Sequence, residues 1–492
     1  MRRIALPLLL AAPPALAAPT AVTLGEPAEP VGLALGPVDL TTPSTLALSA
    51  TSIGRFPVDG DGTQIDGEPA LDALLRVGLV LDSARMSSTF NVRLEAEYEL
   101  VGGIFSGGTT PSPDVLDAPL VEDTDHTLRK ASGRVTLGPF LTVGGGFMTS
   151  YWGLGLIAND GAHGWEPGSA RFTDPRGGDR VLRAFALSGP WTDAKLMVIA
   201  AVDQVQGDDV LRAGDEATQA IAAVTVGDVD RRHLGLYGVF RMQTTRDGAE
   251  TNVTVGDVFG RWSGRLANRV KYTAALESAL IVGETDLGPS TEFPTHDVFQ
   301  LGVAAEAAFD AGSFGGVLSA FFASGDRDAA DGEQNAFKAD VGFEQGLLLY
   351  KVVLAGQSGR GPITAADPDL VGYPADDLDR LTTRGAVTNT FALFPRVWGR
   401  PLAGLEVYGG PLFAWSAVEV ADPRASRLAG GVPTNVYGGT PGGYLGTELD
   451  VGVRYRVLAA GATLTAGLEA GVFTPGSAFE DAEGNRRGAL QG

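Results

Sequence analysis

Apolar and polar residues alternate with a period of two along several stretches of the chain. The pattern occurs in residues 89–100, 269–280, 299–309, 445–457 and 462–472. Because successive side chains of a β-strand point to opposite faces, each stretch would form a strand with one apolar and one polar face. The clearest example sets Phe90, Val92, Leu94, Ala96, Tyr98 and Leu100 against Asn91, Arg93, Glu95, Glu97 and Glu99.

Two architectures contain strands of this kind. A soluble sandwich buries the apolar face between two sheets, whereas a membrane barrel turns it toward lipid. Sandwich strands usually have about five or six residues, but a tilted transmembrane strand needs about ten. The stretches above have the longer length, so they favour the barrel.

Short and long connections alternate along the chain. Short ones are expected near residues 83–86, 138–140, 189–192, 227–230, 263–264, 310–312, 398–401 and 458–461. Long ones are expected at residues 54–70, 102–126, 153–178, 204–215, 282–296, 326–334, 358–384 and 419–441, with 243–249 intermediate. The sequence therefore predicts an all-β fold, a transmembrane antiparallel β-barrel of about 18 strands (range 16 to 20), with short periplasmic turns and long extracellular loops.

The N-terminus has the features of an export signal. Arg2 and Arg3 precede an apolar run, and Ala15-Leu16-Ala17 supplies small residues for cleavage after Ala17. The dense apolar runs 196–202 and 347–354 are much shorter than the about 20 residues of a spanning helix. We expect a signal peptide at 1–17, an N-terminal periplasmic segment at 18–43 and one outer-membrane barrel domain at 44–492.

Aromatic residues gather near the ends of the expected strands. In transmembrane barrels, such residues form girdles at the two membrane interfaces. The candidates are Tyr151, Trp152, Phe259, Trp262, Trp398, Tyr408, Trp415 and Tyr444.

Two runs in the C-terminal third stand out, Gly-Tyr-Leu-Gly-Thr-Glu-Leu-Asp-Val at 443–451 and Gly-Val-Phe-Thr-Pro-Gly at 471–476. Together they resemble the closing hairpin of alginate-export-type outer-membrane porins. The resemblance implies an eighteen-stranded channel that passes an anionic exopolysaccharide through a lumen lined with arginine and lysine. The chain departs from that pattern after Gly476, where a final strand is expected but the residues are mostly small and polar. Either the first strand is miscounted, the last is unusually short, or the sequence is truncated.

The polar faces of the strands supply the candidate lumen residues. Rings of charge determine what a pore admits, although opposite charges on neighbouring strands can also simply pair. The basic candidates are Arg76, Arg93, Arg129, Lys130, Arg134, Arg183, Lys195, Arg241, Arg269, Lys271, Arg454 and Arg456, and the acidic ones are Glu95, Glu97, Glu277, Glu306, Glu406, Glu448, Asp450 and Glu469.

Composition removes several other classes of protein. The 492 residues carry 37 Lys and Arg against 59 Asp and Glu, a net charge of -22, which excludes a nucleic-acid backbone as the main partner. The excess acid lies in the long connections, for example at 114–125 and 367–379, where it keeps loops solvated or binds divalent cations at the cell surface. Cysteine is absent, which excludes thiol chemistry and disulfides.

A metal site and an enzyme both have weak support. Asp59, Asp61, Asp66 and Glu68 resemble the oxygen-rich start of a calcium loop, but Gln64 and Ala70 break the EF-hand pattern. The four histidines are widely spaced, and neither a Gly-x-Ser-x-Gly elbow nor a phosphate-binding glycine loop occurs. We expect no enzyme and no cofactor.

The sequence favours a channel that exports a secreted polysaccharide. Its partners would be outer-membrane lipid and lipopolysaccharide, the polymer, and a periplasmic or outer-membrane export protein. The alternatives are an uptake porin for a small solute and a secreted β-rich adhesin.

Overall fold

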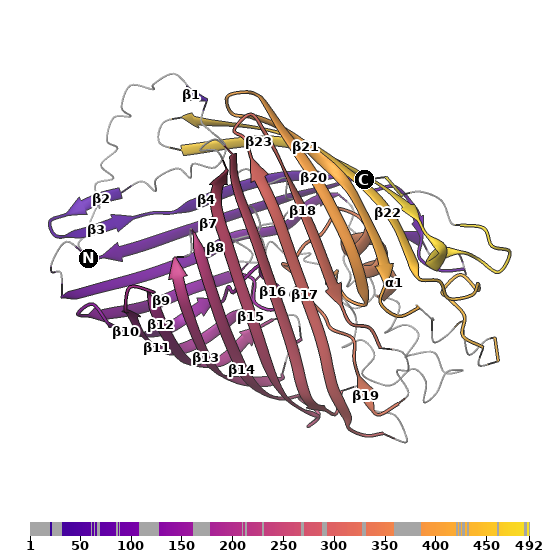
Figure 1. The fold of residues 1–492 in the computed structure, drawn as a ribbon, viewed down its shortest axis with the longest axis horizontal. Helices are drawn as coiled ribbons and strands as arrows, with labels where there is room; N and C mark the ends of the chain where they lie inside the picture. The colour runs from indigo at the N-terminus through magenta and orange to yellow at the C-terminus, as the bar shows by residue number, and fades with distance from the viewer. Residues whose placement is uncertain are drawn as a thin grey trace, which may run out of the picture.

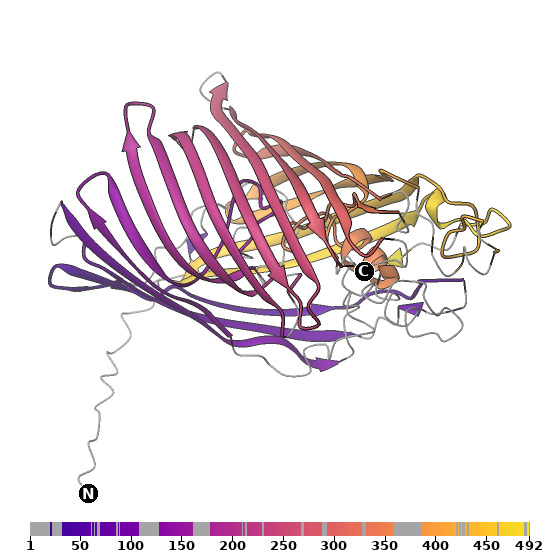
Figure 2. The same ribbon diagram turned by 90° about the horizontal axis from the view of Figure 1, so that it is seen from below.

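A computed structural model describes most of the chain as one large antiparallel sheet (Figures 1 and 2). The described residues are 20–21, 32–60, 62, 64–65, 69–84, 87, 89–107, 127–160, 178–208, 210–211, 214–228, 231–266, 270–287, 293–326, 331–358, 385–419, 422, 425, 429–430, 432–459, 462–486 and 490–491. The predicted signal peptide lies outside these ranges.

The wall of the barrel consists of consecutive strands joined edge to edge. These strands are β4 (Ser44–Thr51), β7 (Ala70–Asp82), β8 (Phe90–Gly107), β9 (Thr127–Leu137), β10 (Leu141–Thr149), β11 (Arg180–Trp191), β12 (Leu196–Gly207), β13 (Glu216–Asp228), β14 (Arg232–Thr244), β15 (Glu250–Leu266), β16 (Val270–Thr285), β17 (His296–Asp310), β18 (Phe314–Ala323), β20 (Thr390–Leu402), β21 (Leu405–Ser416), β22 (Tyr444–Ala459) and β23 (Ala462–Pro475). Each pairs antiparallel with the next, so the described wall has seventeen strands, within the predicted range.

Short turns and long loops alternate between these strands, as predicted. Turns such as 192–195, 311–313 and 403–404 lie at one end of the barrel, and the strand ends that the long connections join, such as Ala323 and Thr390, lie at the other. Two predicted turn positions are wrong. Residues 263–264 lie inside β15 and residues 398–401 lie inside β20, because pairing with the next strand continues past each glycine, to Leu266 and to Leu402.

The outer face of the wall is apolar. Val202, Leu276 and Leu468 are 57%, 53% and 72% exposed, whereas the residues next to them in β12, β16 and β23 on the opposite face are polar or small and often buried. A soluble protein would not expose so large an apolar surface, so this face contacts lipid. The chain is a transmembrane antiparallel β-barrel, and a soluble adhesin is excluded.

Exposed aromatic rings form belts at both ends of the outer face. Phe140 and Trp191 stack at 4.8 Å near the turns, where Trp262 also lies beneath Arg232. Phe391 and Trp415 lie near the loops, with ring centroids 5.9 Å apart. Other predicted girdle residues face the lumen instead, because they belong to the opposite parity of their strands or to a loop inside the barrel: Trp152, Phe259, Trp398 and Tyr408.

The first described residues extend the edge of the sheet. Within the segment predicted to be periplasmic, β2 (Gly32–Leu35) pairs with β3 (Val38–Thr41), and β3 continues the ladder along β7. β1 (Thr20–Ala21) pairs with the turn end of β22. A small separate ladder joins β5 (Phe56–Pro57) to β6 (Gln64–Ile65).

The other edge of the sheet ends in a very short strand. After Pro475 the chain forms the 3-10 helix η4 (Ser477–Phe479), and β24 (Leu490–Gln491) then pairs with Phe473 and Val472 of β23. No ladder between β4 and β23 occurs among the described residues.

Most buried apolar side chains lie inside the barrel near the loop end. The connection between β18 and β20 contains β19 (Glu333–Gln334), the π-helix η1 (Leu349–Leu354) and the short helix α1 (Ala355–Ser358). Leu349, Tyr350 and Val353 of η1 are fully buried against the inner faces of the strands. None of the helices in the described part of the chain is long and apolar enough to cross a bilayer.

Candidate pore and its inserted segments

Residues 150–160, here called the first inserted segment, fold inward from the loop end. Trp152 stacks on Tyr237 of β14 at 4.9 Å and donates a hydrogen bond from Nε1 to Asp257 Oδ1 at 2.6 Å. The Leu154 N–H donates to the Glu277 carboxylate of β16. Arg129 of β9 donates to the Asp160 carbonyl at 2.6 Å. Side chains from four strands, β9, β14, β15 and β16, therefore hold this segment against the wall.

Residues 335–358, the second inserted segment, are held by Glu448 of β22. The carboxylate of Glu448 accepts the N–H groups of Leu347, Leu348 and Leu349 at 2.5, 2.8 and 2.7 Å. At the other side of the segment, the Tyr350 hydroxyl lies 2.9 Å from Thr390 Oγ1. Glu448 thus satisfies three backbone donors that the apolar surroundings would otherwise leave unpaired.

Both segments use glycine at the same point of approach to the wall. Gly153 has φ +60°, and a Cβ there would meet the Glu277 carboxylate at 2.5 Å. Gly346 has φ +73°, and a Cβ there would meet Glu448 Oε1 at 2.9 Å. In each case the N–H that follows the glycine donates to that carboxylate. Only glycine combines the left-handed backbone with so close a contact.

The two inserted segments also contact each other. The Asn159 N–H donates to Asp340 Oδ2 at 3.0 Å, and the Asp340 N–H donates to the Leu156 carbonyl at 2.8 Å. These bonds make the two segments one partition inside the lumen.

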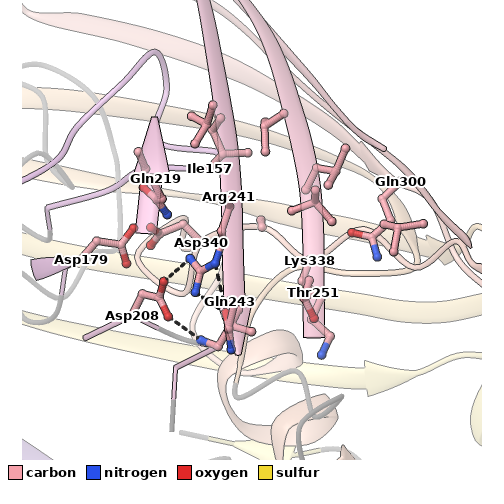
Figure 3. Close-up of a pocket in the computed structure, with 18 of the residues that line it drawn as sticks. Ile157, Asp179, Asp208, Gln219, Arg241, Gln243, Thr251, Gln300, Lys338 and Asp340 are labelled. Atoms are coloured by element: carbon pink, nitrogen blue, oxygen red, sulfur yellow. Dashed lines mark hydrogen bonds and ion pairs between the residues drawn. The ribbon is translucent and has the colours of Figure 1, made fainter. Parts of the chain in front are cut away.

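A cavity of about 480 Å³ separates this partition from the inner face of β11 to β17 (Figure 3). The wall side of its lining includes the aliphatic residues Val181, Val239 and Val253, with Gln243 on the same face of β14 as Val239. Asp340 lines the cavity from the second inserted segment. Since the lining residues of β12 to β14 lie at the loop ends of their strands, the cavity is in the extracellular half of the lumen.

An ion pair forms one corner of the cavity. Arg241 Nη1 lies 2.5 Å from Asp208 Oδ2, and Arg241 Nη2 donates to Gln243 Oε1 at 2.6 Å. Burial alone would raise the pKa of Asp208, but the Arg241 guanidinium and the N–H groups of Leu211 and Val210 hold that pKa below its ordinary value.

This lowered pKa gives a testable dependence on pH. A carboxyl whose pKa is depressed by folding adds stability above its unfolded pKa and loses it as pH falls through the folded value. Asp208→Asn should therefore lower the free energy of unfolding at pH 7 by roughly 1.5–3 kcal/mol. The difference from wild type should shrink only at pH below about 4. Denaturant unfolding of both proteins in detergent from pH 7 to pH 3 measures it, and an equal difference at every pH would contradict the assignment.

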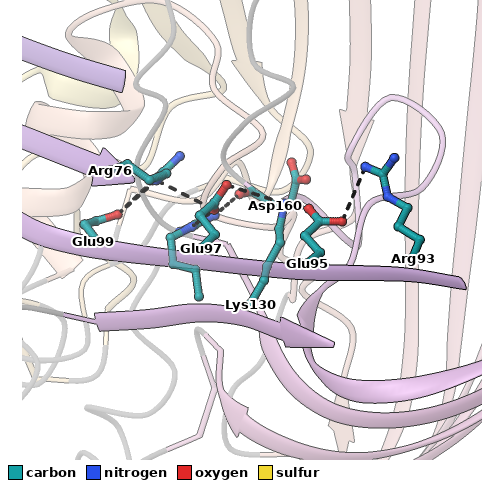
Figure 4. A network of polar contacts seen from close by, with 8 residues as sticks. Arg76, Arg93, Glu95, Glu97, Glu99, Lys130 and Asp160 are labelled. Atoms are coloured by element: carbon teal, nitrogen blue, oxygen red, sulfur yellow. Dashed lines mark hydrogen bonds and ion pairs between the residues drawn. The ribbon is translucent and has the colours of Figure 1, made fainter. Parts of the chain in front are cut away.

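The predicted lumen residues on β7 to β9 form one paired network (Figure 4). Glu97 lies 3.0 Å from Arg129 Nε and 3.8 Å from Lys130 Nζ. The remaining contacts join Arg76 to Glu99 at 2.9 Å, Arg93 to Glu95 at 3.7 Å, Arg93 to Asp82 at 3.5 Å and Lys130 to Glu95 at 3.7 Å. Opposite charges on neighbouring strands thus offset one another here.

A second paired network covers the wall at β17 to β23. Glu406 is fully buried and bridges Arg400 at 3.0 Å and Arg454 at 2.5 Å. Arg396 donates to Ser319, whose hydroxyl donates to Glu306 at 3.1 Å. The other contacts join Arg456 to Thr465 at 3.3 Å and the Tyr408 hydroxyl to Glu469 at 2.5 Å.

The other predicted lumen residues are placed as follows. Arg183 pairs with Asp203 at 2.6 Å beside the cavity. Arg134 faces Arg93 across the β8–β9 ladder, and Lys271 faces Asp310 across the β16–β17 ladder. Asp450 is buried on the same face of β22 as Glu448. Arg269 lies outside the described residues. Lys195 is not in the lumen, because it ends an exposed turn and pairs with Asp228 at 2.7 Å.

The calcium candidate falls mostly outside the described residues. Asp59 is described, whereas Asp61, Asp66 and Glu68 lie outside the described residues. Within those residues, no group of three or more histidine, aspartate or glutamate side chains is arranged to hold a metal ion.

The sequence patterns did not predict the inserted segments. They also did not identify Asp257, Asp340 and Gln243 as lumen residues. The one signal was the apolar run 347–354, which is too short for a membrane helix and has no period-two alternation. Such a run inside a barrel protein indicates a loop that packs within the lumen.

Comparison with known proteins gives neighbours in structure only. No protein-family model and no curated protein matches the chain. The outer membrane protein OprD from Pseudomonas aeruginosa is 11% identical, covers 96% of this chain and 95% of its own, and has a TM-score of 0.48. OpdK from Pseudomonas aeruginosa is 14% identical over 92% and 95%, with a TM-score of 0.45, and a BenF-like porin from Pseudomonas fluorescens Pf-5 is 11% identical over 92% and 96%, with a TM-score of 0.47.

The resemblance to alginate-export-type porins is wrong. The similar solved structures are OprD, OpdK and BenF-like porins, and no family matches at the level of sequence. Residues 443–451 and 471–476 have the apolar and polar alternation of β22 and β23 and the glycines and proline at their loop ends. Any transmembrane barrel needs such alternating strands and turns. The lipid-facing wall and the partitioned lumen define the chain as an outer-membrane-type β-barrel.

Proposed function

We propose that this barrel is a porin, a passive, non-enzymatic channel through which small solutes enter across the outer membrane. The observation that carries the proposal is the cavity of about 480 Å³ between the wall and the two inserted segments. A space of this size matches the pockets that take small molecules, about 300–1,000 Å³. The sequence also suggested export of a polysaccharide with a dedicated export protein. A hydrated polymer would need a wide lumen, whereas the two joined inserted segments narrow the lumen of this barrel.

The test is reconstitution of the full chain in planar bilayers and liposomes. Purified protein should give discrete conductance steps, and liposomes should swell in small solutes such as glycine but not in a polysaccharide. A strain without the protein should secrete its surface polymer normally. Loss of that polymer, or protein that gives no conductance, would overturn the proposal.

A further inference from the structure

An aliphatic surface covers the inner wall of the barrel around the cavity. Other parts of the lumen wall carry the charged networks of β7 to β9 and of β17 to β23. Between these networks, strands β11 to β17 place apolar side chains against the cavity: Val181, Val205, Val239, Val253, Val255, Ile281 and Val298. Because transfer of apolar surface out of water is favourable, a solute with an apolar body is stabilised where it covers these side chains.

The apolar surface is continuous with the inner wall beyond the cavity. Residues 196–202 of β12 are apolar at every position, so this strand is apolar on its lumen side as well as on its lipid side. Ala201 forms a buried cluster with Ile221 and Val239, and Tyr237 packs against it. Since Val239 and Tyr237 also line the cavity, the aliphatic surface extends from the cavity toward the middle of the lumen.

The charged side chains of the described lining already have partners. Arg241 Nη1 lies 2.5 Å from Asp208 Oδ2, and Asp340 accepts the N–H groups of Asn159 and Gly342 at 3.0 and 2.7 Å. The other charged residues of the lining also interact with neighbouring groups: Asp179, Asp326 and Lys338. A charged solute would therefore lose its water against side chains whose charge is already engaged, at a cost that an uncharged solute avoids.

Two neutral amides supply hydrogen-bonding groups at the cavity. Gln219 of β13 and Gln300 of β17 are half-buried in the lining, on two sides of it (Figure 3). Gln300 Nε2 lies 3.5 Å from the Gln334 carbonyl, at the long limit of a hydrogen bond. An amide side chain both donates and accepts, so it fits a hydroxyl or carbonyl group without requiring a charge.

The volume of the cavity sets the size of the solute. An apolar cavity of about 150 Å³ takes one benzene molecule. The cavity of about 480 Å³ therefore has room for an apolar body of one or two rings together with a polar group.

We propose that this cavity binds uncharged solutes that combine an apolar body of one or two rings with a hydroxyl or carbonyl group. The proposal rests on the channel function proposed above. It assigns the binding of the apolar body to the valines and Ile281 of the wall, and the preference for uncharged solutes to the engaged charges of the lining.

The test compares three probes with one carbon skeleton: benzyl alcohol, benzylammonium and benzoate. Each is added at pH 7 to the full chain in planar bilayers, and the reduction of the open-channel current is measured against probe concentration. Benzyl alcohol should reach half-block at a concentration at least about tenfold lower than either ion. Equal or stronger block by benzylammonium or benzoate overturns the proposal. Conductance without block by benzyl alcohol overturns this inference alone, whereas absence of conductance contradicts the channel function.

Variants locate the binding in the cavity. Val253→Thr exchanges a methyl group of the lining for a hydroxyl and should raise the half-blocking concentration of benzyl alcohol about fourfold. Val255→Phe fills part of the cavity and should weaken the block further. Val317→Thr is the matched control, because Val317 is a buried residue of the inner face of β18 outside the lining. If Val317→Thr weakens the block as much as Val253→Thr, or if neither cavity variant weakens it, the assignment is wrong.

Discussion

Replacing Glu448 by alanine should free the second inserted segment and raise the single-channel conductance severalfold. The change removes the acceptor of three buried N–H groups, those of Leu347, Leu348 and Leu349. Each buried donor left unpaired costs about 1–3 kcal/mol, which the segment avoids by moving out of the lumen into water. Planar-bilayer recordings measure the conductance, and liposome swelling in raffinose measures the passage of a larger solute.

The matched control is Glu99→Ala. Glu99 is another carboxylate of the inner wall, and its ion pair is with Arg76 rather than with an inserted segment. Its loss should leave conductance near that of wild type. If both variants conduct like wild type, Glu448 is not what keeps the segment in the lumen.

An arginine at Leu276 should destabilise the barrel by about 2–4 kcal/mol, the cost reported for such a charge at the middle of the bilayer. Leu276 is 53% exposed on the outer face of β16, close to the middle of that strand. Leu276→Arg would place the guanidinium among lipid tails with no partner. Urea titration of the folded protein in lipid, followed by heat-modifiable migration on gels, measures the loss.

The same substitution near the membrane surface provides the comparison. Leu266 is 60% exposed at the turn end of β15. There the arginine can reach headgroups and water, so Leu266→Arg should cost only about 0–1 kcal/mol. Equal costs at the two positions would mean that the outer face of β16 does not lie in the hydrocarbon core.

The wall of the barrel could be predicted because its strands are specified locally. The period of two follows from the geometry of a single strand and does not depend on its neighbours. The alternation around Phe90 and Val451 therefore indicates which side chains face lipid. The ends of the strands were less certain. Gly264 resembles a turn in the sequence but lies in β15, where it pairs with Tyr272 of β16.

The partition inside the lumen could not be predicted, because it depends on contacts between distant residues. Glu448 is one of many acidic residues at strand positions, and only the fold brings it to the N–H groups of residues one hundred positions earlier. Glu277 and Leu154 are likewise 123 positions apart. The sequence could place both carboxylates on the inner face, but whether water, an arginine or a loop covers them is decided by tertiary structure.

The mixed signs of charge in the lumen have a related explanation. Glu97 and Arg129 follow the alternation of their own strands, and the strand order of the barrel makes them neighbours. A count of lumen charges from sequence therefore includes many groups that neutralise each other on the wall. The selectivity of a pore depends on the few that line its cavity.

The seventeen described strands have a consequence for how the wall closes. Since each strand runs opposite to the one before it, the first and last, β4 and β23, point in the same direction. If they joined directly, the seam would be a parallel ladder, unlike every other contact between long strands of the wall. β24 runs antiparallel to β23 at its loop end, in the place where an eighteenth strand would restore the alternation. Because the chain has no cysteine, disulfides engineered between β4 and β23 would distinguish the two seams: direct neighbours lie within bonding distance, and strands two places apart do not.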